Sequence, residues 1–209
     1  MKTIIIIKLF TLFILVAYAC NNQQGMKQSQ PQFYATPEEA IEKAKSDLLT
    51  VIRTNKGIAL GVDEKTLQSA TTGASVRQVN IDFNKLLTAD SLASFDNLQA
   101  GEMSTVFPMV SGNRVITVVE INKSDKGWSI TGLGGKSVAE DLNIVRAAAG
   151  DSATISVYEV PNLQTKVYSV KKAGVEMFYT NFENKFSLRQ GVSAAQLIPD
   201  LKSAAQEFN

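Results

Sequence analysis

Apolar residues recur at helical spacing in three segments of the chain, near residues 36–55, 137–149 and 193–208. The apolar face of the first segment consists of Ile41, Ala44, Leu48, Val51 and Ile52. Each segment opens with a capping-box pattern, a Ser or Thr followed three residues later by Glu or Gln. These patterns predict an N-terminal, a middle and a C-terminal helix, and Pro199 predicts a kink or restart in the last one.

Alternating apolar and polar positions fill the segments between these helices and predict β-strands. The predicted strands are 76–83, 105–110, 115–121, 128–133, 154–160, 165–170 and 175–180. Short polar turns join consecutive strands, which is typical of antiparallel pairing. The sequence therefore predicts an α+β fold with a mostly antiparallel sheet, in one domain over residues 35–209. A helix followed by a meander occurs twice, over 36–133 and 137–180, and both duplication and chance explain this.

The N-terminus has the pattern of a secretory signal peptide over residues 1–19. Lys2 precedes an apolar stretch that ends near Val16, and the small residues Ala17 and Ala19 precede a cut site. The apolar stretch is too short to cross a bilayer, which needs about 20 apolar residues. We therefore expect the chain to be exported.

Two cleavage products fit this segment. An ordinary signal peptidase would cut after Ala19, whereas the segment also resembles the bacterial lipoprotein signal, in which a small residue precedes an acylated cysteine, here Cys20. The resemblance departs from the family pattern at Ala17, where Leu is preferred, and at Tyr18, where a small residue is preferred. Cys20 is the only cysteine of the chain, and a lone free thiol is unusual in an oxidising compartment, which favours lipidation.

Residues 20–34 read as the lipidated Cys20 and a flexible tether rich in Gln, Asn and Ser. The lipoprotein resemblance implies that Asp at position 21 would direct retention in the inner membrane, and Asn21 stands there instead. The tract also lacks the acidic run that marks surface export in some bacteria. We therefore expect a cell-envelope protein anchored by its lipid in the outer membrane and facing the periplasm.

Charge and residue usage exclude several kinds of chemistry. Removal of the signal lowers the Lys and Arg count from 21 to 19 against 20 acidic residues, so the formal net charge changes from +1 to −1 and predicts no nucleic-acid partner. The chain has no histidine, which removes His-based triads and zinc sites. With Cys20 at the terminus, thiol catalysis, iron–sulfur clusters and attached haem are also excluded. We expect no metal and no cofactor.

Three motifs have a functional and a simpler interpretation. The run 132–137 resembles a phosphate loop but lacks its first glycine, and a tight strand-to-helix turn capped by Ser137 explains it more simply. Gly150-Asp151-Ser152 resembles the start of an esterase motif whose family needs a later histidine, so a helix end and turn is expected. Ser169-Val170-Lys171-Lys172 matches S-x-x-K but falls at a strand end, where solvated side chains are expected.

Carboxylates and aromatic residues are the remaining candidates for a site. A glycosidase-like carboxylate pair is one hypothesis, with ordinary surface charge as the alternative; the candidates are Asp82, Asp90, Asp96, Glu102 and Glu120. A partner-binding groove is the other hypothesis, with a core between the last strand and the last helix as the alternative. The candidate partner-binding residues are Trp128, Phe178, Tyr179, Phe182 and Phe186.

A family resemblance covers residues 36–133. The helix pattern Glu38-Glu39-Ala40 with Ala44, followed by a β-meander, is similar to PepSY and streptopain-propeptide-type modules. That similarity implies an α+β module that inhibits or chaperones peptidases. The sequence thus predicts a non-catalytic, membrane-anchored binding or inhibitory module whose partner is an envelope protein or a peptidase. The alternative is a carboxylate-dependent hydrolase acting on envelope carbohydrate.

Overall fold

The computed structural model describes residues 31–55, 61–90, 93–150 and 153–208, except for the side chains of Glu102 and Asn184. The chain divides into two units, Met1–Pro31 and Gln32–Asn209. The predicted signal peptide and Cys20 lie outside the described residues, so the fold below is that of the second unit.

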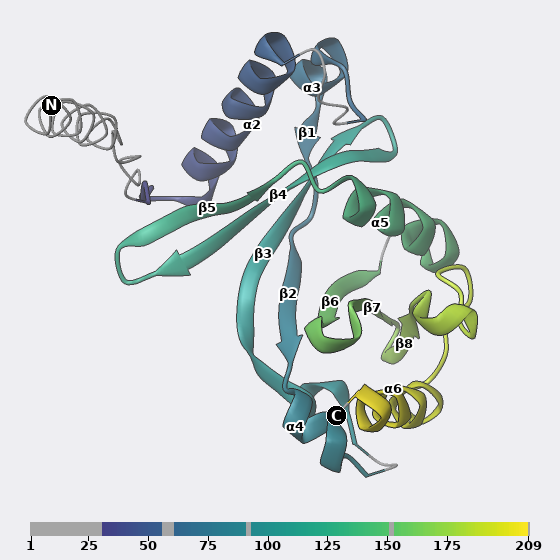
Figure 1. Ribbon diagram of the computed structural model, residues 1–209. Coiled ribbons are helices and arrows are strands. Elements are labelled where there is room, and N and C mark those ends of the chain that lie inside the picture. The colour runs from purple at the N-terminus through teal and green to yellow at the C-terminus, as the bar shows by residue number, and fades with distance from the viewer. Residues whose placement is uncertain (1–30, 56–60, 91–92, 151–152, 209) are drawn as a thin grey trace, which may run out of the picture. The chain divides into compact units, whose positions relative to one another are not determined.

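The second unit is built on one eight-stranded sheet with the strand order β5-β4-β3-β2-β6-β7-β8, and β1 pairs with β3 (Figure 1). The strands are β1 Thr71–Thr72, β2 Val76–Ile81, β3 Gln99–Ser111, β4 Arg114–Ser124, β5 Gly127–Leu133, β6 Thr154–Val160, β7 Thr165–Lys172 and β8 Val175–Tyr179. All neighbouring strands pair antiparallel except β2 and β6, which are parallel. The sheet therefore consists of two antiparallel meanders joined in the middle by one parallel pair.

Five α-helices pack on this sheet. They are α2 Pro37–Thr54, α3 Glu64–Ser69, α4 Phe83–Thr88, α5 Lys136–Ala149 and α6 Ala194–Phe208, accompanied by the 3₁₀ turns η2 Phe95–Leu98, η3 Pro161–Leu163 and η4 Phe182–Asn184. Figure 1 shows α2 and α3 at one end of the sheet and α4 and α6 at the other. The N-terminal, middle and C-terminal helices are all present, which confirms the predicted α+β class.

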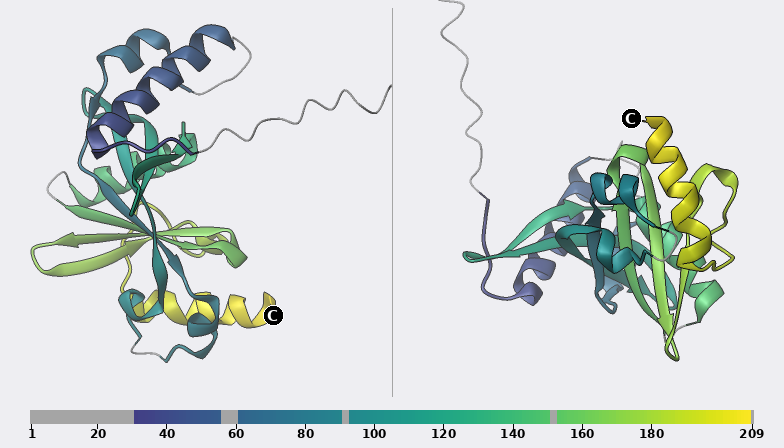
Figure 2. Two further views of the ribbon diagram at one scale, coloured as in Figure 1. Left: turned by 90° about the vertical axis from the view of Figure 1, so that its left-hand side faces the viewer. Right: turned by 90° about the horizontal axis from the view of Figure 1, so that it is seen from below.

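The apolar core consists of three clusters on the two faces of the sheet. On one face, which we call the α5 face, Val138, Leu142 and Val145 of α5 cover Val106 and Val118 and their neighbours. On the opposite face, α2 and α3 cover β3, β4 and β5. At the other end of that opposite face, α4, α6 and η2 cover β2, β6, β7 and β8, and the right-hand view of Figure 2 shows α6 running beside these strands.

The loop before α5 differs from its prediction. The helix starts at Lys136 with Gly135 as its N-cap and no side-chain cap, so the predicted capping role of Ser137 is wrong. The Gly134 amide donates to the Val118 carbonyl (3.1 Å), and a Cβ on Gly135 would lie 2.7 Å from the Val118 side chain. Because only glycine fits this close to β4, Gly135 forms the N-cap and the helix starts one residue before Ser137.

Two other element boundaries also differ from the predictions. The predicted strand 76–83 ends at Ile81, because the Asp82 carboxylate accepts hydrogen bonds from the Asn84 and Lys85 amides and thereby starts α4. Helix α6 contains Pro199 and continues through it, so of the two predicted alternatives, a kink or a restart, the restart is wrong. The predicted hairpin around 111–114 is confirmed, with Ser111 paired to Arg114.

The first described segment is attached to the edge of the sheet. The Tyr34 amide donates to the Trp128 carbonyl (2.7 Å), and the Trp128 amide donates back to the Tyr34 carbonyl (2.9 Å). A Cβ on Gly127 would lie 2.5 Å from the Tyr34 carbonyl oxygen, so this approach requires glycine. The bridge fixes the point where the chain enters the folded unit.

Candidate functional site

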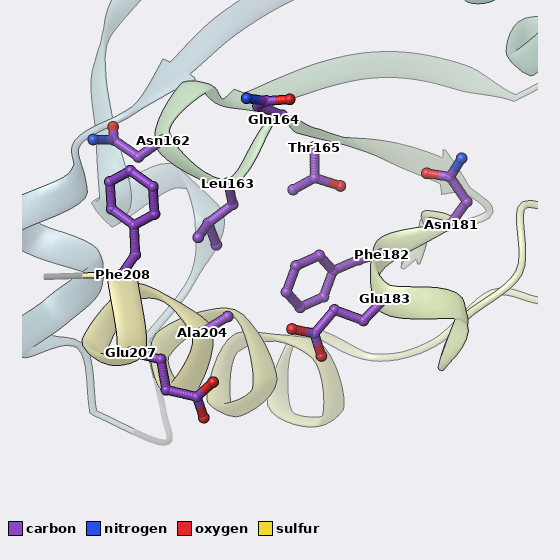
Figure 3. Close-up of a pocket in the computed structure, with 10 residues that line it drawn as sticks. All are labelled: Asn162, Leu163, Gln164, Thr165, Asn181, Phe182, Glu183, Ala204, Glu207 and Phe208. Atoms are coloured by element: carbon purple, nitrogen blue, oxygen red, sulfur yellow. The ribbon is translucent and has the colours of Figure 1, made fainter.

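A pocket of about 490 Å³ opens at the end of the sheet where β7 begins and β8 and α6 end (Figure 3). We call it the edge pocket; its lining residues are Asn162, Leu163, Gln164, Thr165, Asn181, Phe182, Glu183, Ala204, Glu207 and Phe208. Figure 3 shows Phe182 and Leu163 at the back, between the amides above and the two carboxylates below. Its volume lies within the usual range of small-ligand sites, which is roughly 300–1,000 Å³.

Two corners of the edge pocket have an unusual backbone. Gln164 (φ 48°) and Glu183 (φ 50°) are left-handed, and Ala173 is the third non-glycine residue of this kind in the described part of the chain. A left-handed non-glycine residue costs on the order of 1 kcal/mol, and such residues cluster at functional sites. Both corners lie on the rim of one pocket, which marks it as the leading candidate for binding.

Acidic groups give the edge pocket a negative character. Glu183 forms an ion pair with Lys185 (3.1 Å), and Lys185 also contacts Asp200 (3.3 Å). Hydrogen bonds to these two carboxylates raise the pKa of Lys185. Glu207 lies in the last turn of α6, whose free carbonyls add a partial negative charge. The pocket thus combines an apolar back wall with acceptors at its mouth.

The predicted aromatic candidates lie in three different places. Phe178, Phe182 and Phe186 gather in the cluster under α6, and Phe182 alone lines the edge pocket. Tyr179 packs in the cluster on the α5 face. Trp128 packs against the α2 cluster, with the Lys123 ammonium 5.6 Å from its ring centroid. The structure therefore brings three of the five residues together and separates the other two.

A second polar region crosses the α5 face of the sheet. Each of five adjacent strands has a residue under or beside α5. Two positions before or after it, on the same face of the sheet, lies a polar residue. From β4 to β7 these pairs are Val118 and Glu120, Val106 and Ser104, Gln78 and Asn80, Val157 and Glu159, and Tyr168 and Lys166. We call the polar residues of these pairs the polar row; they are Glu120, Ser104, Asn80, Glu159 and Lys166. Asn80 pairs with Glu159, and Glu159 pairs with Lys166, so the row is continuous on that side.

Charged groups concentrate at the polar row. Lys166 forms an ion pair with Glu159. The Tyr168 hydroxyl donates to Asp141 of α5 (2.8 Å). Burial raises the pKa of Tyr168 and also that of Asp141. Burial, followed by the charge of Glu159, raises the pKa of Glu120, whereas Lys166 opposes this shift.

The other predicted carboxylates have structural surroundings. Asp82 caps α4. Asp96 accepts a hydrogen bond from the Tyr158 hydroxyl (3.0 Å), and burial followed by Asp96 raises the pKa of Tyr158 to about 12. Asp90 lines a shallow hollow beside Ile198, and the side chain of Glu102 lies outside the described part. Of the five predicted carboxylates, Glu120 alone is placed in the polar row.

The remaining motifs do not assemble a catalytic group. Ser169 bonds Glu176 on one sheet face, whereas Lys172, three residues further along the strand, donates to the Ala149 carbonyl (2.8 Å). Asp151 and Ser152 lie outside the described residues. Within the described ranges no group of three or more His, Cys, Asp or Glu residues is arranged to hold a metal ion. No helix in these ranges is long and apolar enough to cross a membrane.

Comparison with known proteins returned no match to any protein-family model, curated protein or solved structure. The sequence analysis identified Phe182 and Glu120 but missed the amides of the edge pocket and most of the polar row. The left-handed corners have no sequence signal, because Gln and Glu rarely adopt that conformation.

Proposed function

We propose that this protein is an exported, lipid-anchored module of the cell envelope that binds a partner through the edge pocket without catalysing a reaction. The anchor is the lipid on Cys20, in the outer membrane and facing the periplasm. The partner is an envelope protein or a peptidase that inserts a side chain or chain end into the pocket. The absence of histidine and the single cysteine favour binding over catalysis.

The observation that carries this proposal is the lining of the edge pocket. Its apolar back wall is formed by Phe182 and Leu163, and its mouth carries amides and carboxylates. Ligand sites usually combine such an apolar lining with a few polar groups that orient the ligand. Gln164 and Glu183 on the rim keep a left-handed backbone that non-glycine residues usually avoid, and such strained conformations cluster at binding sites.

A photo-crosslinking experiment in intact cells tests the pocket. A photoreactive amino acid at Asn162, on the rim, is expected to capture one discrete partner, whereas the same amino acid at the exposed Lys65 of α3 captures none. Ala204→Trp fills the pocket and should abolish capture at Asn162, whereas Ser203→Trp, its exposed neighbour on α6, should not. Equal capture from Asn162 and Lys65 would contradict the proposal.

The anchor is tested separately. Cys20→Ala, or treatment with globomycin, is expected to release the protein from membranes and to remove the mass of the lipid. A Cys20→Ala protein that stays membrane-bound with unchanged mass would exclude the lipid anchor and leave the pocket proposal untouched.

A carboxylate-dependent hydrolase of envelope carbohydrate is the second candidate. Glu120 and Glu159 lie on one face, and burial followed by the charge of Glu159 raises the pKa of Glu120, as expected for two carboxyl groups that share a site. Purified protein should be assayed for release of reducing ends from envelope polysaccharide. Turnover that disappears in Glu120→Gln would establish the hydrolase and reject the non-catalytic proposal.

A further inference from the structure

We propose that the polar row is a second binding site, which takes an organic cation, an ammonium or guanidinium group, at Ser104 between Glu120 and Asn80. This site lies on the α5 face and shares no residue with the edge pocket. The inference therefore goes beyond the proposed function and does not depend on it.

Strand register places the three acceptors in a line across three strands, with Ser104 between Glu120 and Asn80. Val106 pairs with Glu120 on β4, and Ser104 follows Val106 two positions along β3 on the same face. Ser104 in turn pairs with Gln78 of β2, and Asn80 follows Gln78 by two positions. Ser104 is thus a diagonal neighbour of both Glu120 and Asn80, at roughly 7–8 Å, whereas Glu120 and Asn80 lie two such steps apart.

Two of these acceptors are buried without a partner. Ser104 is 5% exposed, and its Oγ makes no hydrogen bond to the described residues. The Oδ1 atom of Asn80 is likewise buried and unpartnered. A buried polar group without a hydrogen bond costs about 1–3 kcal/mol, so native proteins rarely keep one unless a ligand or water satisfies it. The structure places both atoms on the same face.

Glu120 supplies the charge. Two other carboxylates lie nearby but have partners, because Lys166 holds Glu159 and Tyr168 donates to Asp141. Glu120 has no hydrogen bond or ion pair with any described residue, although it is half-buried. Three carboxylates against one lysine leave the region negative, so a cation is favoured over an anion. An ammonium or guanidinium group carries at least three donors for these acceptors.

Two glycines shape the space around the acceptors. Gly101 pairs with Asn80, and a Cβ there would meet no atom within 4 Å, so the missing side chain leaves room beside the amide. Gly132 pairs with Glu120, and a Cβ there would lie 2.9 Å from the carboxyl carbon and from Oε2. The β5 backbone therefore lies close to the carboxyl group of Glu120, and Gly101 leaves the strand position opposite Asn80 without a side chain.

Titration of the full-length protein with n-butylammonium and butylguanidinium, followed by NMR amide shifts, tests the site. 1-Butanol serves as the neutral control of the same shape. Saturable shifts at residues 78–80, 104 and 120 are expected for both cations and not for butanol. Shifts confined to the edge pocket, equal binding of butanol, or displacement of the cations by equimolar calcium would each overturn the proposal.

Matched variants separate the role of Glu120 from general charge. Glu120→Gln keeps the shape of the side chain and is expected to weaken cation binding at least tenfold, as loss of a charge-assisted hydrogen bond does. Glu207→Gln removes the same charge at the edge pocket and should change the affinity less than twofold. Ser104→Ala should weaken binding severalfold while leaving the protein folded. Unchanged affinity in both Glu120→Gln and Ser104→Ala would reject the site.

Discussion

The two faces of the sheet differ in how their polar groups are satisfied. On the opposite face, helices cover both ends, and Tyr158 and Ser169 have partners in Asp96 and Glu176, whereas the buried Thr117, which pairs with Met109, has an unpartnered hydroxyl. On the α5 face, helix α5 covers the apolar strand positions beneath it. The polar row lies beside those positions and contains two unpartnered oxygen atoms, Ser104 Oγ and Asn80 Oδ1. The faces differ in the surroundings of these groups, because Ser104 and Asn80 lie beside the charged residues of the polar row, whereas Thr117 pairs with Met109 in the apolar cluster under α2 and α3.

The largest expected effect tests the core of the opposite face. Phe95 is buried and stacks on Phe178 with ring centroids 4.5 Å apart. Phe95→Ala should lower the free energy of unfolding by about 3–5 kcal/mol, because it removes a buried ring and leaves a cavity. Urea unfolding followed by circular dichroism measures this loss. Phe33→Ala, at a position 37% exposed, should cost about 0.5 kcal/mol or less, and a similar loss for both variants would contradict the comparison.

A pair of tyrosines compares the faces directly. Tyr168 on the α5 face and Tyr158 on the opposite face are both buried, and each donates its hydroxyl hydrogen to an aspartate. Tyr168→Phe should cost about 1–2 kcal/mol, since Asp141 then stays half-buried without its donor. Tyr158→Phe should cost less than about 1 kcal/mol, because Asp96 is 56% exposed and keeps its ion pair with Arg77. The reverse order in urea unfolding would show that Asp141 has another partner.

Two buried serines provide a test with a smaller expected effect, in which the two substitutions should change the stability in different directions. Ser169→Ala removes a hydrogen bond to Glu176 and should destabilise the protein by about 1 kcal/mol. Ser104→Ala removes an unpartnered hydroxyl and should leave the stability unchanged or raise it by up to about 1 kcal/mol. Thermal unfolding of both variants in the absence of ligand measures the difference. A loss of stability in Ser104→Ala as large as that in Ser169→Ala would mean that Ser104 is already hydrogen-bonded.

The smallest expected effect is a pH dependence at Glu120. Burial raises its pKa above the ordinary value of a glutamate, so the folded state holds this proton more tightly than the unfolded state. Its contribution to stability is complete below the unfolded pKa and is lost as the pH rises through the folded pKa. The charged groups that act on it are Glu159 and Lys166. Glu120→Gln should therefore stabilise the protein relative to wild type more at pH 7 than at pH 4, and the opposite trend in thermal unfolding would contradict the burial of this carboxyl group.

Much of the fold could be predicted from the sequence, because it depends on local patterns. The capping box at Thr36 and the hairpin around Gly112 each depend on a few neighbouring residues, and the structure contains both. The parallel pairing of β2 with β6 could not be predicted, because it joins segments more than 70 residues apart with no local signal. The start of α5 was misplaced because its position depends on the packing of Gly135 against Val118.

The candidate sites were predictable only in part. Gln78 and Asn80 alternate with Val79 and Ile81, so the sequence suggests a solvent-facing polar side. In the structure Gln78 is buried, because α5 and the neighbouring strands close over that side of β2. Glu120 was identified as a carboxylate candidate, but its neighbours in the polar row come from strands whose order the sequence does not state.

The bridge between Tyr34 and Trp128 has a mechanical consequence. A pull on the chain from its N-terminal side reaches this pair of backbone hydrogen bonds before it reaches α2. These hydrogen bonds, the packing of Tyr34 against the α2 cluster and the contact of Phe33 with Lys126 hold the segment to an edge strand, so this segment should detach while the rest of the sheet stays paired. Opening the bridge would release a few residues of chain, roughly 3.3 Å for each one, without unfolding the domain. A pull from the N-terminal side would thus be absorbed at Tyr34 before it reaches the edge pocket or the polar row.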